Sequence, residues 1–201
     1  MMRMMLYKGN NGLPFPHYPY YIVWLQWNLP VRGNYMDDNH MEKASFAGGC
    51  FWCIHAAFDL LEGVGEVVSG YSGGHVENPS YEEVCAGDTG HVEAVQVEYN
   101  PDKVSYNKLL GVFWESIDPT DDSGQYADKG SQYRSAIFYH DEGQRKLAEE
   151  SRKRLEESKG IVVATQIKKY KNFYPAEDYH QDYYKKNKLR YKLYKRASGR
   201  Y

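Results

Sequence analysis

The feature that most constrains the fold is a change of period along residues 43–184. Short runs with the two-residue period of a β-strand alternate with runs in which apolar residues recur every three or four positions, as on one face of a helix. Several strands follow one another with little between them, which indicates an α+β fold with a mixed sheet rather than a doubly wound parallel sheet. The pattern predicts strands at 43–47, 66–71, 91–99, 132–140 and 161–170, and helices at 50–61, 81–86, 105–117, 142–158 and 176–186.

The two ends of the chain differ in composition from this central part. Residues 1–40 hold four of the eight prolines and few charges, which predicts a poorly ordered or loosely packed extension. A working protein that begins at Met41 is an equal alternative. Residues 185–201 carry eight lysines or arginines and no acid, which predicts a basic, solvated tail, or else a weak anionic contact. The folded domain is therefore expected at 41–184.

The bulk composition excludes several classes of protein. A formal net charge of -2 over 201 residues gives no reason to expect a nucleic-acid or membrane partner. Three cysteines are too few for a disulfide framework, and no run of about 20 apolar residues could span a bilayer. We therefore expect a cytoplasmic protein, and a monomer.

Cys50 lies between a glycine turn and the start of a predicted helix. Unpaired backbone N–H groups at a helix start favour an anion, so this position predicts a lowered pKa and a reactive thiolate. Gly48 and Gly49 would let a substrate approach the sulfur closely. Exposed rings of Phe51 and Trp52 would form a pocket for a small apolar group such as a methyl. The alternative is that Cys50 is a small buried hydrophobic residue.

Cys50 and Cys53 also form a C-x-x-C motif, for which two further interpretations exist. A zinc site would need a second pair of ligands, and no second C-x-x-C is present, so we expect no metal. A thioredoxin-like disulfide oxidoreductase is the stronger alternative, because its motif also follows a strand and opens a helix. That fold would also require a βαβ start and a later strand with a cis-proline, and neither is evident.

Six blocks of the sequence, from about residue 43 to residue 184, resemble the peptide methionine sulfoxide reductases of the A type and occur in the family's order. One block alone would be weak evidence, whereas six in register are strong. The blocks include Gly49-Cys50-Phe51-Trp52, Gly70-Tyr71-Ser72-Gly73-Gly74, Asn78–Cys85 with Gly87–Val95, Phe113-Trp114-Glu115 with Asp118-Pro119, Gly130–Ser135, and Ala176–Gln181.

The resemblance implies a fold and an activity. The fold would be a two-layer α+β sandwich with a mixed sheet and packed helices, which we classify as a ferredoxin-like or plait-type core. The activity would be reduction of methionine-S-sulfoxide, free or in oxidised proteins, as protein repair in the response to oxidative stress. The resemblance implies no bound cofactor, but an external thiol reductant such as thioredoxin or dithiothreitol.

The resemblance also implies roles for single residues. Cys50 would attack the sulfoxide sulfur, Glu93 would protonate the sulfoxide oxygen, and the rings of the next two residues would hold the methyl group. A carboxyl group in an apolar pocket keeps its proton to higher pH, and phenols can donate to a developing negative oxygen. Without the resemblance, Glu93 on an alternating strand would be expected to face solvent. The substrate-binding residues implied are Phe51, Trp52, Tyr81, Asp128 and Tyr133.

The sequence departs from the family in its cysteines. Many members carry C-terminal cysteines that resolve the sulfenic acid, whereas residues 187–201 contain none. Cys53 stands where many members have glycine, so it is the candidate resolving cysteine; Cys85 and direct reduction by an external thiol are the alternatives. If Cys85 is not the resolving cysteine, we expect it to be a buried structural thiol. His55 replaces a glutamate and could tune either thiol, although an exposed position is favoured. His180 is expected to pack or to orient the C-terminal helix.

Overall fold

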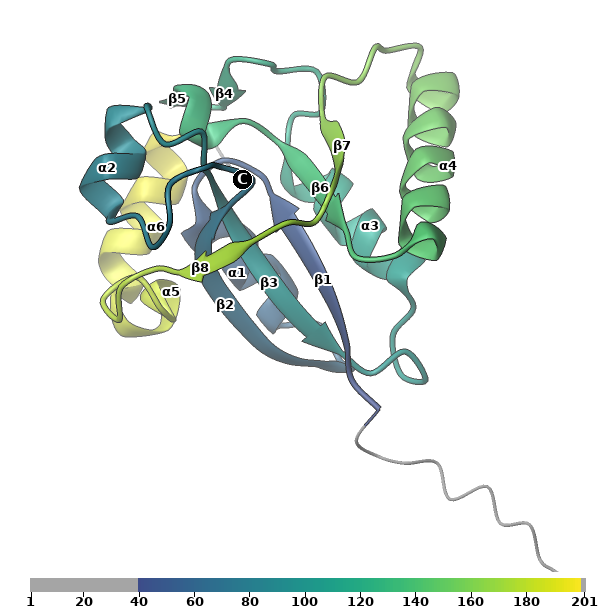
Figure 1. Ribbon diagram of the computed structural model, residues 1–201, viewed down its shortest axis with the longest axis horizontal. Coiled ribbons are helices and arrows are strands. Elements are labelled where there is room, and N and C mark those ends of the chain that lie inside the picture. The colour runs from purple at the N-terminus through teal and green to yellow at the C-terminus, as the bar shows by residue number, and fades with distance from the viewer. Residues whose placement is uncertain (1–39, 200–201) are drawn as a thin grey trace, which may run out of the picture. The chain divides into compact units, whose positions relative to one another are not determined.

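A six-stranded sheet forms the centre of the protein in this computed structural model, which describes residues 40–199 (Figure 1). The strand order is β7-β6-β1-β3-β2-β8, and every pair of neighbours is antiparallel except β6 and β7, which are parallel. The mixed sheet confirms the predicted α+β class. Its strands are β1 (Glu42–Ala47), β2 (Val64–Ser72), β3 (Val92–Tyr99), β6 (Ala136–Tyr139), β7 (Gln166–Lys169) and β8 (Phe173–Pro175).

Helices connect strands that are not neighbours in the sheet. Helix α1 connects β1 to β2, and these two strands lie on either side of β3 in the sheet. Helix α3 lies in the connection from β3 to β6, and these two strands lie on either side of β1. A small second sheet pairs β4 (Gly124–Gln125) with β5 (Asp128–Lys129). The helices are α1 (Phe51–Asp59), α2 (Tyr81–Ala86), α3 (Tyr106–Ser116), α4 (Glu142–Lys159), α5 (Tyr183–Lys186) and α6 (Lys188–Ala197), with a short 3₁₀ turn, η1 (Ser131–Tyr133).

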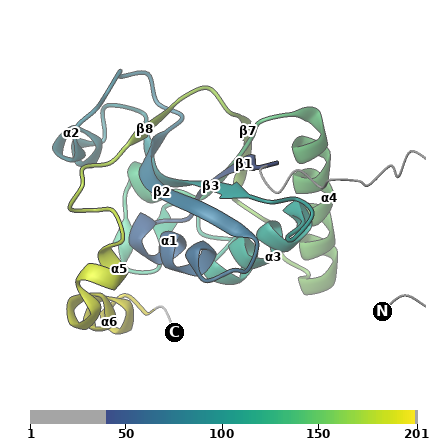
Figure 2. The same ribbon diagram turned by 90° about the horizontal axis from the view of Figure 1, so that it is seen from below.

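The main core lies between the sheet and the helices α1 and α3, which cover the same face (Figure 2). Phe46 of β1 stacks on Phe58 of α1 at 4.9 Å and on Phe113 of α3 at 5.2 Å between ring centroids. The connection from β7 to β8 crosses the other face of the sheet (Figure 1), where Phe173 packs on a small cluster that includes Phe138. The central strands are therefore covered on both faces, which is why residues 44–47 of β1 and five of the eight residues of β3 are buried.

Several predicted elements are shorter in the structure. The strand predicted at 132–140 begins only at Ala136, because Ser131–Tyr133 forms a 3₁₀ turn. The strand predicted at 161–170 is confined to Gln166–Lys169, where it pairs with β6. The helix predicted at 176–186 is helical only at its end, and the unpredicted β8 precedes it. In each case a tertiary contact decides where the element starts.

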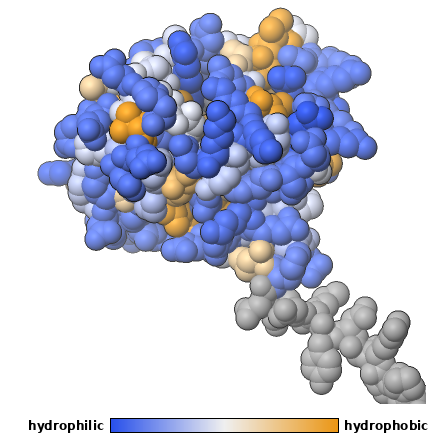
Figure 3. Space-filling view, in the orientation of Figure 1, coloured by the Kyte–Doolittle hydropathy of each residue, from blue (hydrophilic) through white to orange (hydrophobic). Residues whose placement is uncertain are grey.

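The C-terminal segment differs from the solvated tail that its charge predicts. Residues 188–197 form α6, and Tyr191, Tyr194 and Lys195 are only partly exposed. Within residues 40–199, no helix is long and apolar enough to cross a membrane. The face of the molecule seen in Figure 3 is mainly hydrophilic, with apolar side chains in separate small areas. Residues 1–39 of the predicted extension lie outside the described part of the chain.

Candidate active site

Cys50 occupies the start of α1, as its sequence context predicts. It is the N-cap residue, with φ -53° and ψ 118°, and follows Gly49, whose φ of 76° is readily adopted only by glycine. A Cβ at Gly48 would lie 2.6 Å from a side-chain carbon of Ile54 and 2.7 Å from one of Ile117, so a larger residue would push the helix away. The two glycines therefore serve the close packing that presents Cys50.

Burial changes the acidity expected for Cys50. Only 6% of the residue is exposed, and burial raises the pKa of its thiol well above the ordinary value. A hydrogen bond with the Cys53 thiol and the negative charge of Glu93 raise the pKa further, whereas a hydrogen bond with the Tyr194 hydroxyl lowers it. The prediction of a lowered pKa from the helix start is thus wrong for this state, because desolvation disfavours a thiolate more than the helix start favours it.

Glu93 lies in β3 and is directed into the protein. It is 2% exposed, and its Oε2 accepts a hydrogen bond of 3.0 Å from the backbone N–H of Phe51. The solvent-facing alternative for this residue is therefore wrong, because β3 is covered on both faces. Since Phe51 follows Cys50 directly, this bond fixes the carboxyl group beside the nucleophile.

Tyr81 and Tyr133 lie on two other elements, and the charge of Glu93 acts on both phenols. Tyr81 opens α2, and its backbone N–H donates to Glu177 Oε1 at 2.9 Å; Tyr133 ends η1. Burial, together with charged neighbours that include Glu93, raises the pKa of both phenols, so both remain hydroxyl donors. Both tyrosines thus lie within the electrostatic reach of Glu93, and their role in substrate binding stays a prediction.

The predicted aromatic wall is present but largely buried. Phe51 is only 1% exposed, in contrast to the expected exposed ring, and Trp52 is partly exposed. Trp52 stacks on Tyr183 of α5 with ring centroids 3.8 Å apart, and its Nε1–H donates to His180 Nδ1 at 3.2 Å. His180 also packs on Phe51 and Tyr81, which fits its expected packing role. The wall is therefore built jointly by α1 and the C-terminal segment.

Asp128 and Tyr194 close the site from the side of α6. The Tyr194 hydroxyl donates to Asp128 Oδ2 and also contacts the Cys50 thiol, and the Tyr194 ring meets Trp52 edge-on at 5.8 Å. The backbone N–H of Ala127 donates to the carbonyl of Ser198 at 3.3 Å, which ties the β4–β5 turn to the end of α6. Asp128 is thus linked to the Cys50 thiol through the Tyr194 hydroxyl, and its contact with the substrate stays a prediction.

Sequence reasoning did not assign Tyr183 or Tyr194 to the site. Both lie where the abundance of lysine and arginine predicts a charged helix end and a solvated tail. The available signal was the spacing of Tyr191 and Tyr194, which puts two large rings on one face of a helix.

The three cysteines have different surroundings. Cys53 is 8% exposed, and its thiol forms a hydrogen bond with that of Cys50. Cys85 lies on α2, forms a hydrogen bond with Tyr81, and is partly exposed rather than buried as expected. Of the two candidate partners, Cys53 is the one in contact with Cys50.

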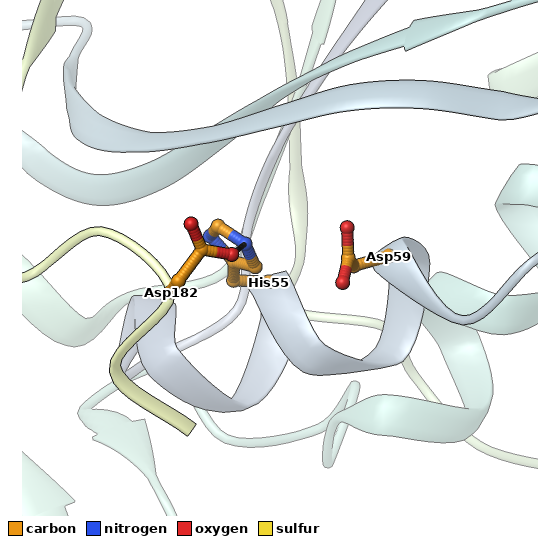
Figure 4. Close-up of side chains that lie close together, drawn as sticks. All are labelled: His55, Asp59 and Asp182. Atoms are coloured by element: carbon orange, nitrogen blue, oxygen red, sulfur yellow. Dashed lines mark ion pairs between the residues drawn. The ribbon is translucent and has the colours of Figure 1, made fainter. Parts of the chain in front are cut away.

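His55 is buried instead of exposed, and belongs to a polar cluster that joins α1 to α5 (Figure 4). Its Nδ1 lies 3.1 Å from Ser69 Oγ and its Nε2 lies 3.5 Å from Asp182 Oδ1. With Asp59, these residues could supply metal ligands. However, Lys185 Nζ already lies 2.6 Å from Asp59 Oδ2 and 3.0 Å from Asp182 Oδ1. The cluster is therefore an ion-pair network that contains its own cation.

The fold and the site together are typical of a cysteine-dependent enzyme. A buried thiol forms a hydrogen bond with a second thiol, and the charge of a buried carboxyl group acts on that thiol and on two phenols. The rings of Phe51 and Trp52 follow the nucleophile directly and pack on His180. Such a set can attack an electrophilic atom and protonate an oxygen that leaves it.

Comparison with known proteins identifies the family. A model of the family described as Peptide methionine sulfoxide reductase matches residues 42–201. Peptide methionine sulfoxide reductase MsrA of Bacillus licheniformis is 57% identical over 162 residues, which are 79% of this chain and 89% of that relative. The crystal structure of Mxr1 from Saccharomyces cerevisiae in reduced form has a TM-score of 0.70 at 35% identity, covering 74% of this chain and 86% of that one. Mxr1 in complex with Trx2 has a TM-score of 0.52 at 25% identity, covering 71% and 84%.

The chain therefore belongs to the peptide methionine sulfoxide reductase family, as the six sequence blocks predict. It is an oxidoreductase that reduces methionine sulfoxide and so repairs oxidised proteins. The alternative of a thioredoxin-like disulfide oxidoreductase is not favoured. The roles of the individual site residues, and the division of the chain at 41 and 184, remain predictions.

Proposed function

We propose that the protein reduces the S epimer of methionine sulfoxide, with Cys50 as nucleophile and Glu93 as proton donor. The observation that carries the proposal is the hydrogen bond from the Phe51 amide to Glu93, which holds a buried carboxyl group beside a buried thiol. The Cys50 sulfur attacks the sulfoxide sulfur while the sulfoxide oxygen takes up a proton. The oxygen is transferred to Cys50, methionine leaves, and Cys50 becomes a sulfenic acid.

Phenols and rings assist this step. Tyr81 and Tyr133 keep their protons, so each donates a hydrogen bond to the oxygen as negative charge develops on it. The rings of Phe51 and Trp52 hold the methyl group, and Asp128 orients the substrate. In the resting enzyme Cys50 is a buried thiol, and the hydroxyl of Tyr194 is the hydrogen-bond partner that favours its ionisation. Substrate binding therefore has to place the sulfoxide sulfur next to the Cys50 thiol, whose ionisation is favoured by the hydrogen bond with Tyr194.

Cys53 resolves the sulfenic acid in this proposal. Its thiol already contacts Cys50, and both residues lie in the first turn of α1, where a C-x-x-C pair can close a disulfide. The Cys53 sulfur attacks the Cys50 sulfur, water leaves, and an intramolecular disulfide forms. A thiol reductant then supplies two electrons and two protons. The complex of Mxr1 with Trx2 supports a thioredoxin-type protein as that reductant, and dithiothreitol can replace it in vitro.

The remaining details of the proposal concern fold and setting. The four central strands run in the order β6-β1-β3-β2 with alternating directions, which supports classification as a ferredoxin-like or plait-type core. The substrates are free methionine sulfoxide and oxidised proteins, and no cofactor or metal is bound. The working enzyme is a cytoplasmic monomer.

The decisive experiment uses separate S and R epimers of a blocked methionine sulfoxide with dithiothreitol. Methionine should form from the S epimer only, and Cys50→Ser should form none. Cys85→Ser is the matched control and should keep the activity. Methionine from the R epimer, or an active and folded Cys50→Ser protein, would contradict the proposal.

A further inference from the structure

A small pocket of about 160 Å³ lies at the same end of the central sheet as Cys50, on the face opposite α1. Figure 1 looks onto this face, with β6 and β7 side by side. Val92 of β3 and Ala136 and Phe138 of β6 form an apolar floor. In the sheet, Ala136 pairs with Ala47, the last residue of β1, and only two glycines separate Ala47 from Cys50. The walls include three glycines, after which we name it the glycine pocket: Gly73, Gly87 and Gly90.

The rim of the glycine pocket carries hydrogen-bond donors. Arg134 follows η1, whereas Gln166 and Lys168 lie on β7. Gln166 pairs with Ala136, and Lys168 pairs with Phe138, across β6 and β7. The polar side chains of β7 therefore stand beside the apolar floor. Within residues 40–199, the side chains of Arg134, Gln166 and Lys168 form no hydrogen bond or ion pair, so their donors are available to a ligand.

The charge of the glycine pocket is positive. Arg134 and Lys168 are its cations, and none of the described residues that line it is acidic. Asp121 and Asp122 line a neighbouring hollow with Arg134, but in the described chain neither forms an ion pair with it, and Asp121 already has a lysine partner. Asp88 is exposed and lies outside the lining. Two cations beside an uncharged floor favour a ligand with an anionic group and an apolar stem.

The turn η1 connects the glycine pocket to the active site. Ser131 lines the pocket, and Tyr133 of the same turn is the phenol expected to bind the sulfoxide oxygen. The floor residue Ala136 lies one strand away from the end of β1, which is three residues before Cys50, so about 15 Å at most separate the floor from Cys50. About four residues of an extended chain cover that distance. A polypeptide bound at Cys50 can therefore reach the pocket.

We propose that the glycine pocket is a subsite for oxidised proteins, which binds the carboxylate of an aspartate or glutamate within about four residues of the methionine sulfoxide. Arg134 and Lys168 pair with the carboxylate, and the amide of Gln166 and the hydroxyl of Ser131 donate hydrogen bonds to it. The methylene groups of the acidic side chain rest on the apolar floor. The subsite rests on the proposed function, in which Cys50 attacks the sulfoxide, and it makes the enzyme selective among oxidised proteins.

Matched peptides test the subsite with the full chain and dithiothreitol. Each pair contains one methionine-S-sulfoxide and carries either glutamate or glutamine at one position, two to four residues before or after it. In at least one pair, the KM of the glutamate peptide should be roughly 5-fold lower than that of its glutamine partner at the same kcat, because the carboxylate is bound equally in the ground state and the transition state. High salt should reduce this preference. Equal KM values in every pair would overturn the proposal.

Variants of the rim test which residues read the acid. Arg134→Gln and Lys168→Gln should each bring the KM ratio of the pair close to one. A blocked methionine sulfoxide is too short to reach the pocket, so its kcat and KM should stay unchanged, which also shows that each variant is folded. Lys169→Gln is the matched control, because Lys169 is the next residue of β7, is exposed and does not line the pocket. A full preference for glutamate in both rim variants would refute the role of the pocket.

The same assays separate failure of the subsite from failure of the proposed function. A folded Cys50→Ser protein that still forms methionine from the blocked sulfoxide would refute the proposed function, and the subsite with it. If Cys50→Ser is inactive and the unmodified protein reduces glutamate and glutamine peptides with equal KM, the subsite alone is wrong.

Discussion

The active site is built from two regions that differ in how far their sequence reveals them. The region from β1 to α1 behaves as its local pattern predicts: β1 spans Glu42–Ala47 and α1 spans Phe51–Asp59, with Cys50 between them. The region from residue 176 to residue 199 does not, although it supplies Tyr183 and Tyr194 to the same site. The nucleophile thus comes from local sequence, whereas its surroundings come from a distant segment that looks like a charged surface.

The reason lies in how the two regions are stabilised. In β1, Ala44 and Phe46 alternate with polar residues, and in α1 Ile54 and Phe58 lie one helical turn apart, so the apolar pattern alone identifies both elements. In the C-terminal region, neither α5 nor α6 contains a buried residue. It is attached by tyrosine rings and by polar contacts such as those of Asp182 and Lys185 with α1. Such contacts have no sequence period.

The largest effect is expected from Glu93→Gln, in the central strand. The amide keeps the shape of the side chain but cannot act as an acid, so kcat/KM for the sulfoxide should fall by roughly 10² or more. Glu98→Gln on the same strand is the matched control, because Glu98 is partly exposed and pairs with Lys43. Steady-state kinetics with dithiothreitol would measure both. A loss of less than about 3-fold in Glu93→Gln would remove Glu93 from the mechanism.

Tyr194→Phe tests whether α6 serves the chemistry or only covers the site. Loss of the hydroxyl removes the contact that lowers the pKa of Cys50, so the pKa rises further and less thiolate forms near neutral pH. The acidic limb of the pH profile of kcat/KM should move to higher pH by about one unit, with roughly 10-fold less activity at pH 7. Alkylation of Cys50 by iodoacetamide should shift in parallel.

The control for this experiment is Tyr139→Phe, the same change on β6 outside the site. It should leave the pH profile unaltered. If Tyr194→Phe lowers the activity equally at all pH values, the hydroxyl acts through structure and not through the ionisation of Cys50.

His55 tests the attachment of the C-terminal region to α1. Burial lowers the pKa of His55 below its ordinary value of 6.5, although Asp182 and Asp59 oppose the shift. Below about pH 6.5 the unfolded chain takes up a proton that folded His55 does not, so this residue makes the free energy of unfolding decrease as pH falls through that window. Above pH 6.5 His55 is mainly neutral in both the folded and the unfolded chain, so it no longer changes the free energy of unfolding with pH.

Urea unfolding at pH 7.5 and pH 5.5 would measure this dependence. His55→Gln should reduce the difference in unfolding free energy between the two pH values, whereas His75→Gln, at an exposed position, should preserve it. Because burial also lowers the pKa of His140 and His180, part of the dependence should persist in His55→Gln. An identical pH dependence in wild type and His55→Gln would show that the buried state of His55 has no energetic consequence.

The sequence by itself determined the α+β class, the strand–glycine–helix unit that presents Cys50, and the family to which the chain belongs. These features depend on local period, on glycine at tight turns and on short motifs, all of which are written in consecutive residues. Glu93 is an intermediate case: its strand was predictable, but its burial required the packing of α1, whose Phe51 N–H donates to it, onto β3.

Only the tertiary structure decided the acidity of Cys50, the burial of His55, the short strand β8 and the contribution of Tyr194. The pKa of Cys50 depends on the surfaces that cover it, and those include a helix more than 130 residues away along the chain. Desolvation and hydrogen bonding act through space, so residues that are far apart in sequence and polar in composition can still set the chemistry of one sulfur atom.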